Sequence, residues 1–220
     1  DGGAGGIVIE GAYSSVAFIT PFSVVTAAAR FEDLTIQDAY LVGIDASAAN
    51  IALQRATIDN TSAAPVSYGV RGDGSLAIVD SVISGTRSNS GHDYAARFDG
   101  DVTIERSTIS DNGGEYKGGV TVIGDVRVTD STFIGNNPLD RPEILGVTGS
   151  LVIENSSFID NGATLGGPGG LIDIAGDFQI VNATFAGNAS GSSYTGGPPA
   201  ATILVRGGNT GSIVNSTLTG

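Results

Sequence analysis

The sequence predicts an all-β fold, a right-handed parallel β-helix of about eight coils with 24–27 residues in a typical coil. Three observations support this fold class. Short segments of alternating apolar and polar residues recur at a nearly constant interval, turns rich in Gly and Asn separate them, and no window has helical periodicity. A period of this length with strand-like content is typical of a solenoid, in which each repeat packs only against its neighbours.

Composition bounds the domain organisation and the partners. We expect one domain over 1–220, with irregular first coils over 1–30, regular repeats over 31–220 and no independent cap domain. The net charge of −13, from 23 acidic and 10 basic residues, argues against nucleic acid as a partner. No apolar run approaches the roughly 18 residues of a membrane span. A chain without Cys, Met or Trp and with 34 Gly suits an extracellular or cell-surface protein.

The first strand of each unit is an alternating segment such as Leu151-Val-Ile153, whose last apolar residue we treat as the anchor of the unit. The anchors are spaced 17, 25, 26, 24, 25, 27 and 33 residues apart, and they are Ile36, Leu53, Ile78, Ile104, Val128, Ile153, Ile180 and Ile213.

A second apolar position follows each anchor from Leu53 onward, after a polar pair and a small, mostly hydroxyl-bearing residue. Its members are Ile58, Ile83, Ile109, Phe133, Phe158, Phe185 and Leu218. Another alternating strand then ends at a glycine that we expect to need positive φ or to allow close approach of neighbouring coils. These strands are 68–74, 94–100, 118–124, 143–149, 170–176 and 202–207.

Two columns of polar residues predict that the coils stack in register. Two places after the anchor, acidic and basic residues alternate before Asn takes over, so opposite charges would be neighbours. The members of this column are Asp38, Arg55, Asp80, Arg106, Asp130, Asn155, Asn182 and Asn215. Eight places after the anchor, stacked Asn side chains could hydrogen-bond along the axis. This second column is Asn112, Asn136, Asn161 and Asn188. We interpret both columns as structural ladders.

Three tetrapeptides of the form Phe-x-x-Asn, which begin at Phe133, Phe158 and Phe185, resemble the repeat signature of polymorphic outer-membrane proteins. More broadly, 31–220 is similar to the right-handed β-helix repeats of autotransporter passengers and secreted adhesins. The resemblance implies the fold, and it implies a function only weakly, because such folds serve as adhesins, lyases, epimerases and fibre proteins.

A catalytic site would need two carboxylates, or a base with a charge-neutralising cation, on the outer face of one sheet. The best local cluster contains His92, Arg97, Asp99 and Asp101. His92 lies in a polar loop, where exposed charges are expected without any catalysis, so we expect no enzyme activity and keep these residues as alternative candidates.

Calcium and ice are two further ligands to consider. Acidic residues beside the corner glycines could converge along the stack, yet the six to eight oxygen ligands of a calcium site cannot be assigned, so we expect no cofactor or metal. The residues concerned are Asp73, Asp99, Asp101, Asp125 and Asp177.

Ice binding would need a flat threonine array. The column of Thr108, Thr132, Thr184 and Thr217 is interrupted by Val82 and Ser157, and we expect it to face a corner.

Five sequons of the form Asn-x-Ser/Thr could carry glycans in a secreted protein. They begin at Asn60, Asn155, Asn182, Asn188 and Asn215. Several fall inside the repeat itself, so composition alone accounts for much of the count.

The two termini predict a partner. Asp1–Gly11 matches a turn and second strand, and the chain stops after a first strand, so joined tail to head the two ends resemble one complete unit. We therefore expect an extracellular structural or adhesive β-helix that contacts copies of itself end to end, as in a filament, or flanking coils of a longer chain. The alternative is a polysaccharide-binding or polysaccharide-cleaving β-helix.

Overall fold

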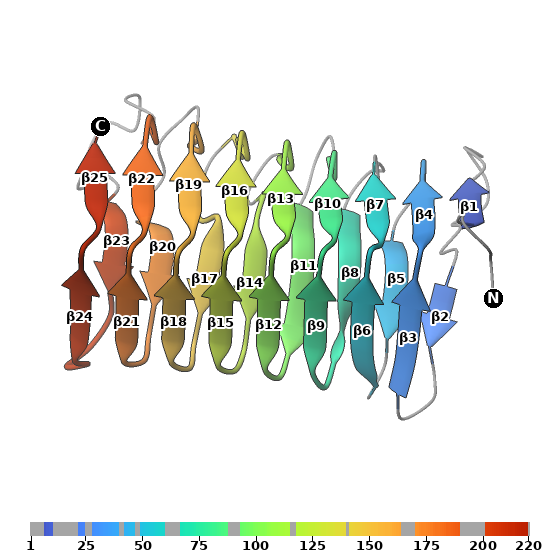
Figure 1. Cartoon of the computed structure of the whole chain (residues 1–220), viewed down its shortest axis with the longest axis horizontal. Coiled ribbons are helices and arrows are strands. Elements are labelled where there is room, and N and C mark those ends of the chain that lie inside the picture. The colour runs from blue at the N-terminus through green and yellow to red at the C-terminus, as the bar shows by residue number, and fades with distance from the viewer. Residues whose placement is uncertain are drawn as a thin grey trace.

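The computed structural model describes residues 7–10, 22–24, 28–39, 42–46, 49–59, 67–87, 93–114, 118–139, 141–163, 170–189 and 201–219. These residues form three parallel sheets, A, B and C, with nine, eight and eight strands respectively. The chain passes from a strand of sheet B to one of C and then one of A, and repeats this order along a straight rod (Figure 1). The predicted class, an all-β parallel solenoid, is confirmed.

Sheet A contains β1 (Ile7–Glu10), β4 (Leu34–Gln37), β7 (Thr57–Asp59), β10 (Val82–Ser84), β13 (Thr108–Ser110), β16 (Thr132–Ile134), β19 (Ser157–Ile159), β22 (Thr184–Ala186) and β25 (Thr217–Thr219). Sheet B contains β2 (Phe22–Val24), β5 (Val42–Ala46), β8 (Ser67–Asp73), β11 (Asp93–Asp99), β14 (Val120–Val122), β17 (Leu145–Val147), β20 (Gly170–Ile174) and β23 (Ala201–Val205). Sheet C contains β3 (Ala28–Glu32), β6 (Asn50–Gln54), β9 (Leu76–Val79), β12 (Val102–Glu105), β15 (Val126–Thr129), β18 (Leu151–Glu154), β21 (Phe178–Val181) and β24 (Gly211–Val214).

The core is built from columns of identical positions, because in-register pairing places each apolar residue directly beside its counterpart in the next coil. In sheet A, Ile109 pairs with Phe133, Phe133 with Phe158, and Phe158 with Phe185. The rings of Phe133 and Phe158 stack with centroids 4.7 Å apart, and those of Phe158 and Phe185 stack at 5.0 Å. All four side chains are almost completely buried. Such stacks add offset aromatic attraction to ordinary apolar burial.

The register of the first coil corrects one predicted column. Leu53 pairs with Phe31 in sheet C, whereas Ile36 lies in sheet A beside Ile58. Leu34-Thr-Ile36 is the last strand of its unit. It resembles a first strand because Leu34 occupies the place that a small residue takes in the other units. The neighbour of Arg55 is therefore Asp33 and not Asp38, which follows β4 at another corner.

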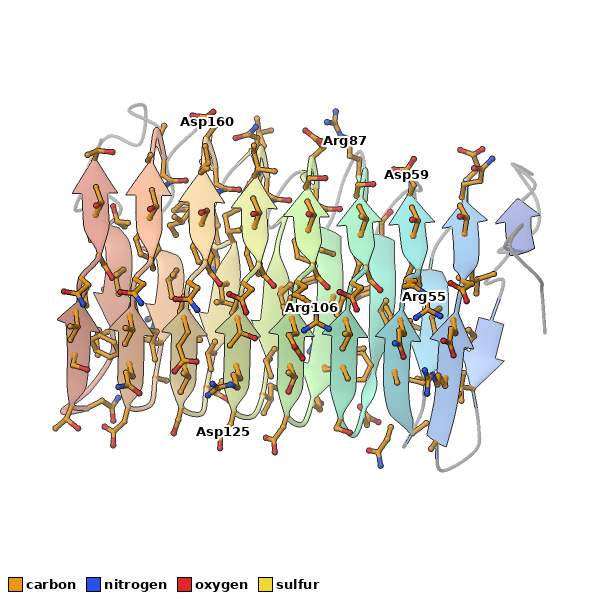
Figure 2. All side chains as sticks on the ribbon, viewed as in Figure 1. Arg55, Asp59, Arg87, Arg106, Asp125 and Asp160 are labelled. Carbon is orange, nitrogen blue, oxygen red and sulfur yellow. The ribbon has the colours of Figure 1, made fainter. Side chains whose placement is uncertain are left out.

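Ion pairs occupy the corner between sheets C and A, where the side chains of Arg55 and Arg106 lie (Figure 2). Arg55 donates from Nε to Asp33 Oδ1 at 2.6 Å, and Arg106 donates from Nε to Asp80 Oδ1 at 2.7 Å. Residues of this column have φ near +50° and still donate their backbone N–H to the next coil. Further along this column Asn replaces the charged residues, and Asn182 Nδ2 donates to Asn155 Oδ1 at 3.1 Å. Apart from Asp38, the predicted ladder is in register.

The predicted asparagine ladder lies inside the corner between sheets A and B and is confirmed. Asn112 Nδ2 donates to Asn136 Oδ1 at 3.0 Å, Asn136 Nδ2 to Asn161 Oδ1 at 2.9 Å, and Asn161 Nδ2 to Asn188 Oδ1 at 3.1 Å. Each amide also donates to a backbone carbonyl, as Asn136 does to Ile109 O at 2.8 Å. The ladder therefore satisfies buried backbone groups that the sheets leave unpaired.

A column of buried serines at the corner between sheets C and A has the same function. Ser107 N donates to Ser131 Oγ at 3.1 Å, and Ser131 Oγ donates to Thr129 O at 2.7 Å. The small hydroxyl residue of the repeat is therefore a backbone partner and does more than fill space.

Corner glycines have both predicted roles. Gly100 has φ of 152°, and a Cβ there would collide with the carbonyl oxygen of Gly74 in the preceding coil. At Gly176 a Cβ would likewise collide with Gly149 O. Close coil-to-coil approach therefore requires glycine at these corners.

The structure also corrects the prediction for the termini. Ile7–Glu10 forms β1 in sheet A beside β4, and it is not a strand of sheet B. Because β25 also belongs to sheet A, joining the tail to the head would place two sheet A strands in succession. The join therefore does not complete a coil.

Candidate functional site

The outer face of sheet B carries a charged hollow where β5, β8 and β11 lie side by side. In-register pairing aligns Asp45 with Arg71 and Arg71 with Arg97. It likewise aligns Tyr68 with Tyr94 and Asp73 with Asp99. Three columns of functional side chains therefore follow the rod axis on one face. The hollow has a volume of about 280 Å³ and is lined by Asp45, Ala46, Tyr68, Arg71, Gly72, Asp73, Arg97 and Asp99.

Tyr68 lines this hollow, and Tyr94 of the next strand stacks against it. The rings of Tyr68 and Tyr94 are parallel, with centroids 5.3 Å apart, and with Val42 they form an apolar cluster separate from the main core. The guanidinium carbon of Arg71 lies 5.3 Å from the ring centroid of Tyr68, and that of Arg97 lies 5.9 Å from the centroid of Tyr94. Both arginines are therefore positioned by cation–π attraction.

One arginine of the pair is already neutralised. Arg71 donates from Nη2 to Asp45 Oδ2 at 2.6 Å. This hydrogen bond from Arg71 to the Asp45 carboxylate raises the pKa of Arg71 above its ordinary value. The pair holds the N-terminal end of the hollow in a fixed arrangement.

Three charged groups of the hollow remain available to a ligand. Arg97 makes no ion pair within the part of the chain that the structure describes, and its side chain is exposed. Asp73 and Asp99 are also exposed, and their carboxylates make no hydrogen bond or ion pair with the described residues. A guanidinium donor beside two carboxylate acceptors suits a ligand with many hydroxyl groups, which both donate and accept hydrogen bonds.

Further along the same face, the charged side chains are already paired. Arg206 Nε donates to Asp173 Oδ1 at 2.6 Å, and this hydrogen bond raises the pKa of Arg206. Thr121 Oγ1 donates to Glu143 at 3.0 Å. Among the described residues of sheet B, the hollow between β5 and β11 is therefore distinguished by its unpaired charges.

The structure divides the four predicted catalytic candidates. Arg97 and Asp99 line the hollow. Asp101 lies at the corner between sheets B and C, where its Oδ1 accepts a hydrogen bond from Asp125 N at 3.0 Å. It therefore has a structural role and does not reach the hollow. His92 lies outside the described residues.

Sequence reasoning missed the other half of the site. Asp45, Tyr68 and Arg71 come from other coils, and only the register brings them to Arg97 and Asp99, whereas Tyr94 lies in the same strand, β11. The signal was present in the repeat, because Tyr68-Gly-Val-Arg71 and Tyr94-Ala-Ala-Arg97 carry Tyr and Arg at the same spacing in consecutive units.

The five acidic residues considered for calcium do not converge. Asp73 and Asp99 line the hollow, whereas Asp101, Asp125 and Asp177 accept backbone hydrogen bonds along the corner between sheets B and C. Figure 2 shows Asp125 at that corner. Among the described residues, no group of three or more His, Cys, Asp or Glu side chains could hold a metal ion.

The sequons fall into two structural classes. Asn155, Asn182 and Asn215 are exposed at the corner between sheets C and A. Asn188 belongs to the internal ladder and donates to Phe158 O at 2.8 Å, so a glycan there would disrupt the coil. Asn60 lies outside the described residues.

Over the described residues, no helix has the length and apolar character needed to cross a bilayer. The model of a family described as the right-handed β-helix region matches residues 25–218. Neither the curated proteins nor the solved structures contain a match to the chain. The narrower resemblance to autotransporter passengers stays a prediction.

Proposed function

The chain belongs to the right-handed β-helix family, and from this premise we propose that it is an extracellular adhesive protein whose rod presents a carbohydrate-binding site on sheet B. The observation that carries this proposal is the hollow lined by Tyr68, Arg71, Asp73, Arg97 and Asp99. The rest of the molecule supports a mechanical role, because every coil is tied to the next by backbone pairing and by side-chain ladders. End-to-end association with copies of itself stays a prediction.

A sugar would bind through its hydroxyl groups and its ring edge. Asp73 and Asp99 can each accept two hydrogen bonds, and Arg97 can donate several. Because the strands are hydrogen-bonded neighbours, these groups repeat at about 4.8 Å along the rod. The side chains project from strands rather than loops, so little ordering is needed when a ligand binds.

The alternative function, cleavage of a polysaccharide, has one specific observation in its favour. Asp73 and Asp99 are paired across neighbouring strands, and retaining glycoside hydrolases place two carboxyl groups about 5–5.5 Å apart. Such an enzyme also needs one carboxyl in apolar surroundings, so that it stays protonated and can act as the acid. Both carboxylates are exposed here, and this environment favours binding without cleavage.

The test measures binding of the purified chain to a panel of soluble polysaccharides by affinity electrophoresis and calorimetry. We expect Arg97→Ala and the double variant Asp73→Asn/Asp99→Asn to weaken binding by about tenfold or more, because each removes charge-assisted hydrogen bonds of about 1.5–3 kcal/mol. Arg127→Ala on sheet C and Asp130→Asn on the outer corner are the matched controls, since each removes an exposed charge outside the hollow.

Two results would change the proposal. Binding to no polysaccharide, or equal loss in the control variants, would remove the carbohydrate site. Release of reducing ends by the native chain, abolished in Asp73→Asn/Asp99→Asn, would instead establish the hydrolase.

A further inference from the structure

The outer face of sheet A is a regular array of hydroxyl and methyl groups. Pairing aligns Thr35 with Thr57, Thr57 with Val82, and so on through Thr108, Thr132, Ser157, Thr184 and Thr217. A second outward column, two residues further along each strand from β10 onward, contains Ser84, Ser110, Ile134, Ile159, Ala186 and Thr219. The threonine column was expected at a corner. It lies on strands instead, because three-residue strands are too short for their alternation to be recognised in the sequence.

No ionisable side chain occurs in either column from β10 to β25, although the chain carries 33 ionisable Asp, Glu, Lys and Arg side chains, 23 acidic and 10 basic. The outer faces of the other two sheets differ, since sheet B displays Arg97 and Asp99 and sheet C displays Arg127 and Glu154. The corner that borders this part of sheet A carries Asn155, Asn182 and Asn215 beside the last three coils. The uncharged area therefore extends beyond the strands on that side, whereas Asp111 and Asp160 follow β13 and β19 at the opposite edge.

The hydroxyl groups of the first column are free. The Oγ1 atoms of Thr108, Thr132 and Thr184 make no hydrogen bond to any residue that the structure describes, and the side chains are only partly buried. Each hydroxyl can therefore donate one hydrogen bond to water and accept others. Thr and Val are stiff at χ1, so the positions of their hydroxyl and methyl groups are fixed by the backbone.

The spacing of the array is fixed in both directions. Neighbouring strands lie about 4.7–4.9 Å apart, and alternate residues of one strand lie about 6.6 Å apart. The strands of sheet A run side by side with little change of direction along the rod, and no other described element passes in front of them (Figure 1). The stacked Phe133, Phe158 and Phe185 rings support the sheet from inside. Long flat sheets are unusual and generally depend on such internal ladders.

We propose that the outer face of sheet A from β10 to β25 binds the surface of ice. An ice crystal is a neutral lattice in which every oxygen both donates and accepts hydrogen bonds at a constant repeat. Fixed hydroxyls at a comparable repeat can hold water in that arrangement, and the intervening methyl groups of Val82, Ile134 and Ile159 exclude competing orientations. A charged side chain would hold its own hydration shell, and this face has none. The inference concerns a different face from the carbohydrate site and is independent of it.

The test uses the full chain at high concentration and measures thermal hysteresis and partition into slowly growing ice. We expect the native chain to lower the growth temperature of ice below its melting temperature and to be enriched in the ice. In Thr132→Lys/Thr184→Lys, two charged side chains stand in the middle of the array. This variant should enter ice at least about tenfold less, the factor given by 1.4 kcal/mol of lost binding free energy.

The matched control is Ala77→Lys/Gln179→Lys, which places two lysines on the outer face of sheet C without an adjacent basic residue in their columns. It should behave as the native chain, and circular dichroism should show that both variants are folded. Exclusion of the native chain from ice, or equal loss in both lysine variants, would overturn the proposal. The proposal would also be overturned if the native chain had no activity on ice and instead bound crystalline cellulose or chitin, or associated with itself, in a way that Thr132→Lys/Thr184→Lys abolished.

Discussion

Two ladders run along this rod, and they differ in how their members are connected. The inner ladder contains Asn112, Asn136, Asn161 and Asn188, and the outer ladder contains Asp33, Arg55, Asp80, Arg106 and Asp130. In the inner ladder each amide bonds to the next, so the chain of hydrogen bonds is continuous. In the outer ladder the charges associate in separate pairs, Arg55 with Asp33 and Arg106 with Asp80.

Burial accounts for the difference in their expected contributions to stability. Asn136 is 0% exposed, whereas the side chains of Arg106 and Asp80 are 48% and 37% exposed. A buried amide that loses its partner has no water to replace it, so its bonds are costly to remove. In an exposed ion pair the attraction between the charges is largely offset by the loss of their hydration, so the pair contributes little to stability. Equal spacing in the sequence therefore does not imply equal stabilisation.

The largest predicted effect follows from removing one member of the inner ladder. Asn136→Ala should lower the free energy of unfolding by about 3–5 kcal/mol, because each buried group that loses its partner costs about 1–3 kcal/mol. Asn112 N and Asn112 Nδ2 lose an acceptor and Ile109 O loses a donor, while Asn161 Oδ1 keeps only the backbone N–H of residue 136. Urea unfolding followed by circular dichroism measures the change.

The adjacent Asn137→Ala is the control for this variant. Asn137 is exposed and makes one side-chain hydrogen bond with the described residues, to Gly135 O at 2.9 Å, so the loss of stability should be small. Similar destabilisation by the two substitutions would mean that the inner ladder has no special role.

Much of the fold could be predicted from the sequence because the repeat appears in nearly every coil. The anchors and second apolar positions from Leu53 onward pair as predicted, since a one-residue slip would turn their side chains out of the core. The prediction for the first coil was wrong because Leu34-Thr-Ile36 has the same pattern as a sheet C strand. Only three-dimensional pairing with β7 distinguishes the two assignments.

The candidate site was harder to predict because its residues come from different coils. Arg97 and Asp99 are close in the sequence, but Asp45 reaches Arg71 across 26 residues. Asp101 was included among the catalytic candidates because it is close to Asp99 in the sequence, although the turn at Gly100 directs it to the corner between sheets B and C. Solenoids convert distance along the chain into adjacency along the axis, so their sites follow the period and not local clusters.

A smaller effect is expected from extending the inner ladder by one coil. Thr86 occupies the next position in the column, its N donates to Asn112 Oδ1 at 3.0 Å, and its buried Oγ1 has no partner among the described residues. Thr86→Asn would provide an amide that can donate to Asn112 Oδ1 and to a backbone carbonyl of the preceding coil. We expect a gain of about 1 kcal/mol, the usual net value of an added hydrogen bond.

A double-mutant cycle in urea unfolding tests the origin of this gain. If it comes from the ladder, it should disappear when Asn112 is first replaced by Ala. A gain that persists in the Asn112→Ala background would assign the effect to filling space around Thr86 and not to the ladder.

The smallest effect is expected at the outer ladder and depends on pH. The hydrogen bond from Arg106 lowers the pKa of Asp80 below 3.8, its ordinary value, and Arg55 lowers that of Asp33 in the same way. A carboxyl whose pKa is lower in the folded state contributes stability above its unfolded pKa and loses it as the pH falls through the folded value. Asp80→Asn should therefore lose less stability than the native chain on acidification from neutral pH to below 3.8.

Urea unfolding at a series of pH values measures this difference, which high salt should reduce because the pair is exposed. The amide is tolerated at this position, since Asn155 has nearly the same φ in the same column. Identical acid dependence in the two proteins would mean that the outer pairs fix the direction of their side chains without stabilising the stack.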